Sequence, residues 1–301
     1  GVRKGGMIMN FRDFLANLQS VRDYEEESLK DLVLSDIKVY LEKINADAGK
    51  EKGFSLIMLK NGSDVFNALN GVGGYSGVMI KSPHYIGLAV TKENYEDEFF
   101  GAYYMQSVVK KLQEMYLGSC WIDIRGVSDD IKAKLAGDCA LRVNYLLAFG
   151  IADEKALKNK KLRTSVTNEA SEYRQNPYGI KHAEAEISDR ARLALGEIVY
   201  MHEWGRPATY EELENRGMAD LFFYIRNAPS YKNLQPCRII LKDGEAELTV
   251  LEPENPRNYI DAGIMMYTLE GLAKDLGIPG KWSFVGPKAD KGYGIAAHIE
   301  L

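Results

Sequence analysis

Residues 228–238 place turn-forming and hydrogen-bonding side chains together, directly before an apolar run at 239–241. The segment reads Ala-Pro-Ser-Tyr-Lys-Asn-Leu-Gln-Pro-Cys-Arg. Its two prolines stiffen the backbone, and Ser230, Asn233 and Gln235 supply hydrogen-bond donors and acceptors. A plain loop rarely needs all of these residue types within so few positions; a proline-bracketed loop without a function is the alternative.

Two further segments carry groups that could bind an anion. Ser20-Val21-Arg22 precedes a helical pattern, although such a tripeptide is also an ordinary helix start. Lys158, Lys160, Lys161 and Arg163 follow an apolar strand pattern at 145–150. A phosphate needs cations of this kind, and arginine offers a bidentate fork. A solvated surface run is the alternative for this cluster.

The elements that must position these residues occur twice along the chain. Strand patterns at 57–62 and 239–244 both end in a turn dipeptide, Asn-Gly or Asp-Gly. Tyr-Glu-Glu opens helical patterns at 24–26 and 210–212, which end near Leu41 and Ile225. Long apolar helix patterns run from Gly101 to Trp121 and from Gly263 to Trp282, with Gly118 and Gly277 where helix C-caps belong. Three matches in the same order indicate an internal repeat.

We therefore expect two related halves, at 10–165 and 170–301, joined by a polar crossover at 153–176. The first half holds about 20 extra residues between Asp64 and Asp97, since the spacing between matches falls along the chain. Each half predicts helices packed on a mainly antiparallel or mixed sheet, which is the α+β class. The two long helices are apolar on more than one face, so we expect them to be buried at the centre.

The candidate segments resemble two elements of the FMN-dependent nitroreductase family. Residues 228–238 resemble its APSxxNxQPW element, with Cys237 in place of the tryptophan. Ser20-Val21-Arg22 resembles its RRSVR element, with Leu18 in place of the leading arginine. In that family the first element lies against the flavin and is supplied by one subunit to a site built mainly by the other. The second element holds the FMN phosphate and ring.

Each half retains only one of these two elements. With 228–238 aligned on 46–56, Ser230, Asn233 and Gln235 fall on Ala48, Glu51 and Gly53. The second half has Arg-Pro-Ala-Thr at 206–209, where the first half has its Ser-Val-Arg. The resemblance therefore implies a nitroreductase dimer fused into one polypeptide: a nitroreductase-like fold that forms an intramolecular pseudo-dimer, with one composite FMN site and a monomeric chain.

The resemblance also implies a function and a set of binding residues. Hydride would pass from NAD(P)H through flavin N5 to a nitroaromatic, quinone or similar small-molecule acceptor; a degenerate flavin or nucleotide binder without turnover, or a relic of the fold with no cofactor, is the alternative. The backbone near Asp123 and Ile124 would stabilise the reduced flavin, and the chemistry would be flavin-borne, without catalytic side chains. The implied cofactor-binding residues are Ser20, Val21, Arg22, Trp121, Ile122, Asp123, Lys161, Arg163, Pro229, Ser230, Asn233 and Gln235.

Composition argues against several other classes of protein. The formal charge of −5 disfavours a nucleic-acid binder. Three cysteines give no disulfide framework or CxxC motif, which favours a reducing cytoplasm. No stretch approaches the ~18 apolar residues of a membrane span, and we interpret residues 1–6 as a disordered or appended tail rather than a signal peptide. The histidines have no metal-ligand spacing, and the glycine-rich run at 71–77 precedes a strand pattern at 84–90, unlike a dinucleotide loop.

Overall fold

The computed structural model describes residues 8–74, 77–136, 142–155, 192–278, 280–290 and 292–301. The chain divides into two compact units, each of which is discontinuous in sequence. The first comprises Gly1–Ile8, Leu18–Glu93 and Ser107–Asp189, and the second comprises Met9–Asn17, Asn94–Gln106 and Arg190–Leu301. The predicted boundary between halves falls outside the described residues, so the division at 165–170 stays a prediction.

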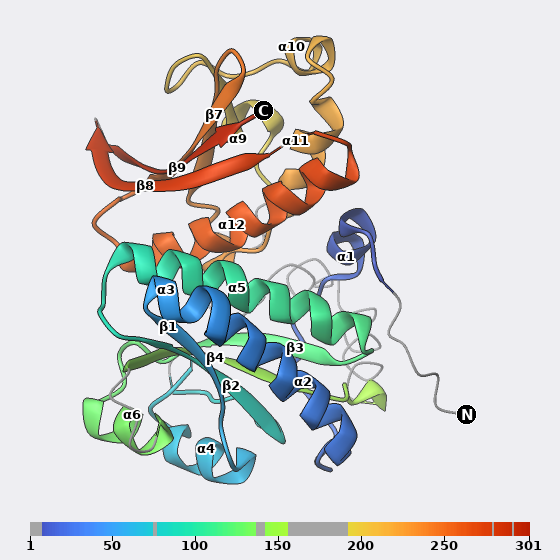
Figure 1. Cartoon of the computed structure of the whole chain (residues 1–301), viewed down its shortest axis with the longest axis vertical. Helices are drawn as coiled ribbons and strands as arrows, with labels where there is room; N and C mark the ends of the chain where they lie inside the picture. The colour runs from blue at the N-terminus through green and yellow to red at the C-terminus, as the bar shows by residue number, and fades with distance from the viewer. Residues whose placement is uncertain (1–7, 75–76, 137–141, 156–191, 279, 291) are drawn as a thin grey trace, which may run out of the picture. The chain divides into compact units, whose positions relative to one another are not determined.

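The first unit is built on a four-stranded antiparallel sheet. Its order is β1-β2-β4-β3, formed by β1 (Phe54–Met58), β2 (His84–Val90), β4 (Arg142–Gly150) and β3 (Gly118–Asp123). Helix α2 (Asp31–Ile44) covers one face, and α4 (Gly62–Leu69) and α6 (Asp129–Ala136) cover the other (Figure 1). A hydrophobic core fills the space under α4 and α6, with Val65, Leu69, Ile122 and Leu146 among its buried members.

The second unit contains a five-stranded sheet in the order β5-β6-β7-β9-β8. The strands are β5 (Val199–Met201), β6 (Cys237–Leu241), β7 (Glu245–Leu251), β9 (Tyr293–Glu300) and β8 (Lys281–Asp290); only the β5–β6 pair is parallel. The helices of this unit are α1 (Phe11–Asn17), α9 (Leu195–Ile198), α10 (Tyr210–Asn215), α11 (Ala219–Ile225) and α12 (Pro256–Asp275). Helix α5 (Tyr95–Glu114) contributes residues 95–106 to this unit and 107–114 to the first.

The two sheets share a strand order and a bulge. Strands β6-β7-β9-β8 repeat the order β1-β2-β4-β3. One extra residue, Asn144, bulges from β4 opposite β2, and Ala296 does the same in β9 opposite β7. Phe54 pairs with Val90 and Cys237 with Val250, so Cys237 corresponds to Phe54. The sequence alignment, which placed Cys237 on Ser55, is therefore one residue out of register.

The α+β class with antiparallel and mixed sheets is confirmed. Strand β2 and the strand pattern at 145–150 are found where they were predicted. The pattern opening at Tyr210 does reach Ile225, but as two helices separated at Gly217, which adopts a φ of 69°. Helix α12 is buried on several faces, as expected from its sequence.

Three local predictions are wrong for identifiable reasons. Helix α2 begins at Asp31 rather than Tyr24, because Tyr24 forms a β-bridge with Ala152. Asn61-Gly62 is not a hairpin turn, because the Asn61 side chain accepts from the backbone of Ser63 and Asp64 and caps α4. Gly118 is the first residue of β3, not a helix cap. Gly277, by contrast, ends α12 with a φ of 71°, as predicted.

A close approach of helices fixes one glycine of the second unit. A Cβ on Gly263 in α12 would collide with the carbonyl oxygen of Phe99 in α5. Only glycine allows the two backbones to meet at this point. Within the described part of the chain, no helix has both the length and the apolar character required to cross a bilayer.

Candidate functional site

The Ser-Val-Arg segment is fixed at one end of the first unit's sheet. Ser20 forms a parallel bridge with Ser119 of β3, and Val21 N donates to the Ser119 carbonyl at 3.0 Å. Further along, Tyr24 bridges Ala152, and Glu25 N donates to the Ile151 carbonyl at 2.9 Å. Arg22 lies between these two anchors, so its backbone position is set from both sides.

Val21 explains why β3 begins with glycine. The Val21 side chain is buried, and a Cβ built on Gly118 would lie 2.6 Å from its Cγ2. Any larger residue at position 118 would push the segment away from the strand. Gly118, which was predicted to cap a helix, therefore leaves the space that the segment carrying Ser20 and Arg22 needs beside β3.

Ser20 and Arg22 converge on a buried thiol. Both side chains hydrogen-bond to Cys120, whose side chain is buried in β3. Burial raises the pKa of the Cys120 thiol to about 11, although Arg22 opposes the shift. The thiol is therefore protonated at neutral pH and is not a nucleophile. The cluster is instead a set of donors, a hydroxyl and a guanidinium, oriented at the end of the sheet.

Strand alternation separates the three predicted residues of β3. Ile122 points into the core, whereas Trp121 and Asp123 are half-buried on the other face. Ile124 N donates to the Asn144 carbonyl of β4 at 2.9 Å. By alternation, the N–H groups of Trp121 and Asp123 point away from β4, toward the side on which Val21 reaches Ser119. The Ile124 N–H, which was predicted to stabilise the reduced flavin, is therefore already hydrogen-bonded within the sheet.

The first unit thus brings Ser20, Val21 and Arg22 beside the outer edge of β3, where Trp121 and Asp123 present backbone groups. Lys161 and Arg163, the predicted phosphate cations, lie outside the described residues, and so do Lys158 and Lys160.

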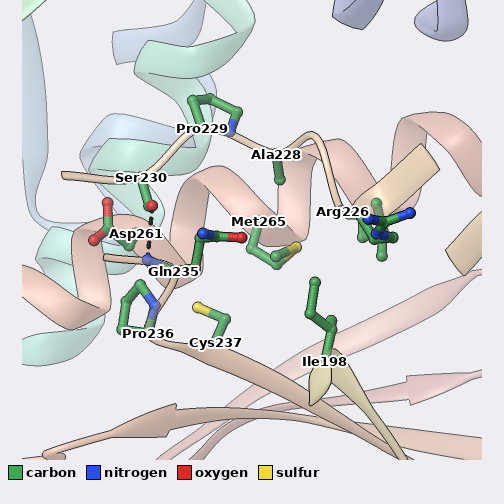
Figure 2. Close-up of a pocket in the computed structure, with 11 residues that line it drawn as sticks. Ile198, Arg226, Ala228, Pro229, Ser230, Gln235, Pro236, Cys237, Asp261 and Met265 are labelled. Carbon is green, nitrogen blue, oxygen red and sulfur yellow. Dashed lines mark hydrogen bonds between the residues drawn. The ribbon is translucent and has the colours of Figure 1, made fainter. Parts of the chain in front are cut away.

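In the second unit, the loop at 228–235 is held by its own polar side chains. Ser230 is buried, and its Oγ accepts from Gln235 N at 2.9 Å (Figure 2). Tyr231 N donates to Asp261 Oδ1 of α12 at 2.9 Å. Asn233 and Gln235 adopt left-handed φ angles of 53° and 49°. Left-handed backbone is uncommon for residues other than glycine and is concentrated at ligand clamps and active sites.

The Gln235 amide makes two further contacts. Its Oε1 accepts from Leu193 N at 3.0 Å, and its Nε2 donates to the Asn233 carbonyl at 3.3 Å. Arg192 Nη1 donates to the Ala228 carbonyl, and Arg226 Nε donates to the Leu193 carbonyl, each at 2.8 Å. Sequence reasoning missed Arg192 and Arg226, because their partners are backbone carbonyls and leave no pattern of side chains.

Cys237 lies beside a small cavity between this loop and α12. Ile198, Ala228, Pro229 and Met265 line the same cavity, which has room for about one water molecule (Figure 2). Cys237 is buried, and burial followed by the nearby Asp261 raises the pKa of its thiol well above the usual range. Cys237 is therefore a small buried residue whose thiol is not a nucleophile.

Pro229, Ser230, Asn233 and Gln235 therefore share one loop, with Ser230 and Asn233 buried and Pro229 half-buried. Across the described ranges, no group of three or more histidine, cysteine, aspartate or glutamate side chains could hold a metal ion.

A comparison with models of protein families shows to which family the chain belongs. A family model described as "Putative TM nitroreductase" matches residues 13–184, more than half of the chain. The chain belongs to this nitroreductase family. The crystal structure of a "putative nitroreductase" from Thermotoga maritima shares 17% identity and a TM-score of 0.54, covering 100% of this chain and 97% of the other. At that identity, the likeness to this nitroreductase shows the fold alone.

Two further nitroreductase-type structures align with about half of the chain. An FMN-dependent nitroreductase from Clostridium difficile R20291 has 23% identity and a TM-score of 0.37, covering 46% of this chain and 86% of its own. An NADPH:FMN oxidoreductase from Vibrio harveyi, complexed with NAD⁺, has 12% identity and a TM-score of 0.37, covering 48% and 70%. A search of curated proteins finds no match.

Proposed function

We propose that this nitroreductase-family chain is an FMN-dependent oxidoreductase. It would take hydride from NAD(P)H and pass it through flavin N5 to a nitroaromatic, quinone or similar acceptor, with one FMN per chain. Family membership supports the reaction class. The observation that carries the proposal is the bridge between Ser20 and Ser119, because it seats the Ser-Val-Arg segment along the edge of β3.

The donor set of the first unit fits FMN. The cofactor has a phosphate and a flavin ring with several hydrogen-bond acceptors. The Ser20 hydroxyl and the Arg22 guanidinium can donate to such oxygens, and charge-assisted bonds from arginine to phosphate are strong. Backbone N–H groups of β3 are fixed dipoles that need no reorganisation when a ring atom gains charge.

In this proposal each group has a defined part. FMN supplies the redox chemistry, and the protein supplies binding and orientation. Arg22 would hold the phosphate or ring, and the backbone at Trp121 and Asp123 would donate to the ring near N5. Ile122 would keep β3 in the core, and Val21 would keep the segment on the strand. Lys161 and Arg163 stay predicted phosphate contacts.

The loop of the second unit completes the sequence-based hypothesis. Pro229, Ser230, Asn233 and Gln235 would lie against the flavin, which would make one composite site and a monomeric chain. The main alternative is a flavin or nucleotide binder without turnover. The departures at Leu18 and Cys237 favour a further alternative, a relic of the fold with no cofactor.

Spectroscopy of the purified protein separates these functions. We expect the protein to bind FMN at one per chain and to be bleached anaerobically by NADH or NADPH. Arg22→Met should weaken FMN binding by about tenfold or more, since a charged hydrogen bond is lost. Arg12→Met, at an exposed position of α1, is the matched control and should bind normally.

Three results would contradict parts of this proposal. A colourless protein that ignores added FMN would exclude both flavin functions. Binding without bleaching would establish the alternative. Two FMN per chain would exclude a single composite site, and light scattering that gives a dimer mass would exclude the monomer.

A further inference from the structure

Two residues that precede α9 clamp the loop at 228–235, with two hydrogen bonds to the loop and a third to Arg226 just before it. Arg192 donates to the Ala228 carbonyl at one end of the loop. The Leu193 backbone acts twice: its N–H donates to Gln235 Oε1, and its carbonyl accepts from Arg226 Nε. The clamp therefore joins both ends of the loop to a single short segment of chain.

The loop needs such a clamp because its backbone is unusual. Asn233 and Gln235 both hold left-handed φ angles. Residues other than glycine keep this conformation only where the surroundings over-determine it. Inside the loop, Ser230 Oγ accepts from Gln235 N, and Gln235 Nε2 donates to the Asn233 carbonyl. Gln235 is thus the residue through which the internal contacts and the clamp are connected.

The arginines of the clamp work in partly dry surroundings. Arg192 is half-buried, and burial lowers the pKa of its guanidinium to about 10, so it remains charged at neutral pH. A charged donor on a backbone carbonyl forms a stronger hydrogen bond than a neutral donor does. An arginine that only covered the surface would leave its head group in water.

We infer that Arg192, Arg226 and Gln235 are positioning residues that fix the 228–235 loop for cofactor binding. Within the loop proposed to lie against the flavin, Gln235 then acts through its contacts to the loop backbone and to Leu193, so its amide positions the loop and is not itself a ligand of the flavin. This inference rests on the proposed function, in which the loop lies against FMN.

The test measures the loop and the cofactor separately. Hydrogen exchange of amides 230–235 is recorded in protein without FMN, for the wild type and for Arg192→Met, Arg226→Met and Gln235→Met. FMN affinity and melting temperature are then measured for the same proteins. Arg216→Met is the matched control, because Arg216 also donates to a backbone carbonyl, that of Lys242 at 2.8 Å, but in the β6–β7 turn.

We expect each clamp variant to exchange the loop amides about tenfold faster and to bind FMN about tenfold more weakly. Arg192→Lys should recover most of both, since an ammonium can still donate to the Ala228 carbonyl. Arg216→Met should change neither the loop exchange nor the FMN affinity. Arg226→Met and Gln235→Met combined should cost less than the product of their separate effects, because both act through Leu193.

Two outcomes would overturn the inference. Faster loop exchange with unchanged FMN affinity would make the clamp purely structural. Weaker FMN binding in Gln235→Met alone, with loop exchange unchanged, would make Gln235 a direct ligand. Failure of the proposed function is recognised separately, because the wild-type protein itself would then not bind FMN, and the inference would fall with it.

Discussion

Strands β1 and β6 occupy the same place in two sheets of the same order, yet their surroundings differ. In the first unit, α2 continues through a π-helical turn, η1 (Asn45–Gly49), and a short helix, α3 (Lys50–Lys52), directly into β1. In the second unit, α11 stops at Ile225 and a loop with one 3₁₀ turn, η2 (Tyr231–Asn233), leads to β6. A common sheet therefore does not dictate the segment that enters it.

The outer edges of the two strands are satisfied in different ways. The Asn45 side chain bonds to both backbone groups of Leu56 in β1, with Nδ2 donating at 2.9 Å and Oδ1 accepting at 2.8 Å. In the second unit, β5 pairs with β6 as a parallel strand. An edge strand must pair or cover its backbone groups. The Asn45 side chain thus satisfies backbone groups at the outer edge of β1, as β5 does at the edge of β6.

The first residues of the two strands differ in size. Phe54 and Cys237 occupy equivalent positions, and both are 3% exposed. The smaller residue lies beside the cavity of the second unit. The loop at 228–235 thus lies against a smaller side chain than its counterpart does.

The largest effect is expected from Phe54→Cys. Removing a buried aromatic ring should lower the free energy of unfolding of the first unit by about 3 kcal/mol, through lost transfer energy and a new cavity. Chemical denaturation measures the change. If the variant is as stable as the wild type, Phe54 is not a core residue.

The reciprocal change, Cys237→Trp, serves as the matched comparison. The cavity holds only about one water molecule, so an indole ring would overpack the site. We expect a loss of about 2 kcal/mol. A variant as stable as the wild type would show that the loop yields easily, contrary to a clamped loop.

Asn45→Ala should have the next effect. It removes both contacts to Leu56 and leaves backbone groups of a strand edge without their partner. We expect a loss of about 2 kcal/mol in the free energy of unfolding. Asn17→Ala is the control, because Asn17 makes a single exposed contact to the Asp13 carbonyl and should lose under about 0.5 kcal/mol. If Asn45→Ala and Asn17→Ala lose the same free energy of unfolding, Asn45 does not satisfy the edge of β1 in the way that β5 satisfies the edge of β6.

The sequence predicted the elements better than it predicted their ends. Strand β2 and the Gly277 cap were visible because burial pattern and turn chemistry agree there. The start of α2 was not, since Tyr24 is held by Ala152, more than 100 residues away in sequence. Local propensity carries no information about such a partner.

The candidate site shows the same limit. The motifs predicted Ser20, Arg22, Ser230 and Gln235 as cofactor-binding residues. They did not predict that Ser230 and Gln235 bond to each other, or that Leu193 binds the Gln235 amide through its backbone. A side chain that binds a backbone group leaves no partner residue type in the sequence. The repeat offset was one residue out because it was taken from the similarity of residues 57–62 and 239–244, whereas the strand pairing makes Phe54 the counterpart of Cys237.

The smallest expected effect is a pH dependence of stability. It distinguishes β2, which contains His84, from its counterpart β7, which contains no histidine. His84 Nε2 accepts from Leu29 N at 2.9 Å, so that nitrogen carries no proton in the folded state. Burial lowers the pKa of His84 below 6.5, so the folded protein binds fewer protons than the unfolded chain. Stability from this group is fully present above the unfolded pKa of about 6.5 and is lost below it, as the pH falls through the lower pKa of the folded state. The melting temperature of the first unit should therefore fall slightly between pH 7.5 and pH 5.5.

His84→Gln keeps an acceptor for Leu29 that does not titrate, so it should flatten this dependence, whereas His202→Asn in the second unit should leave it in place. A dependence that persists in His84→Gln would assign the pH response to another group.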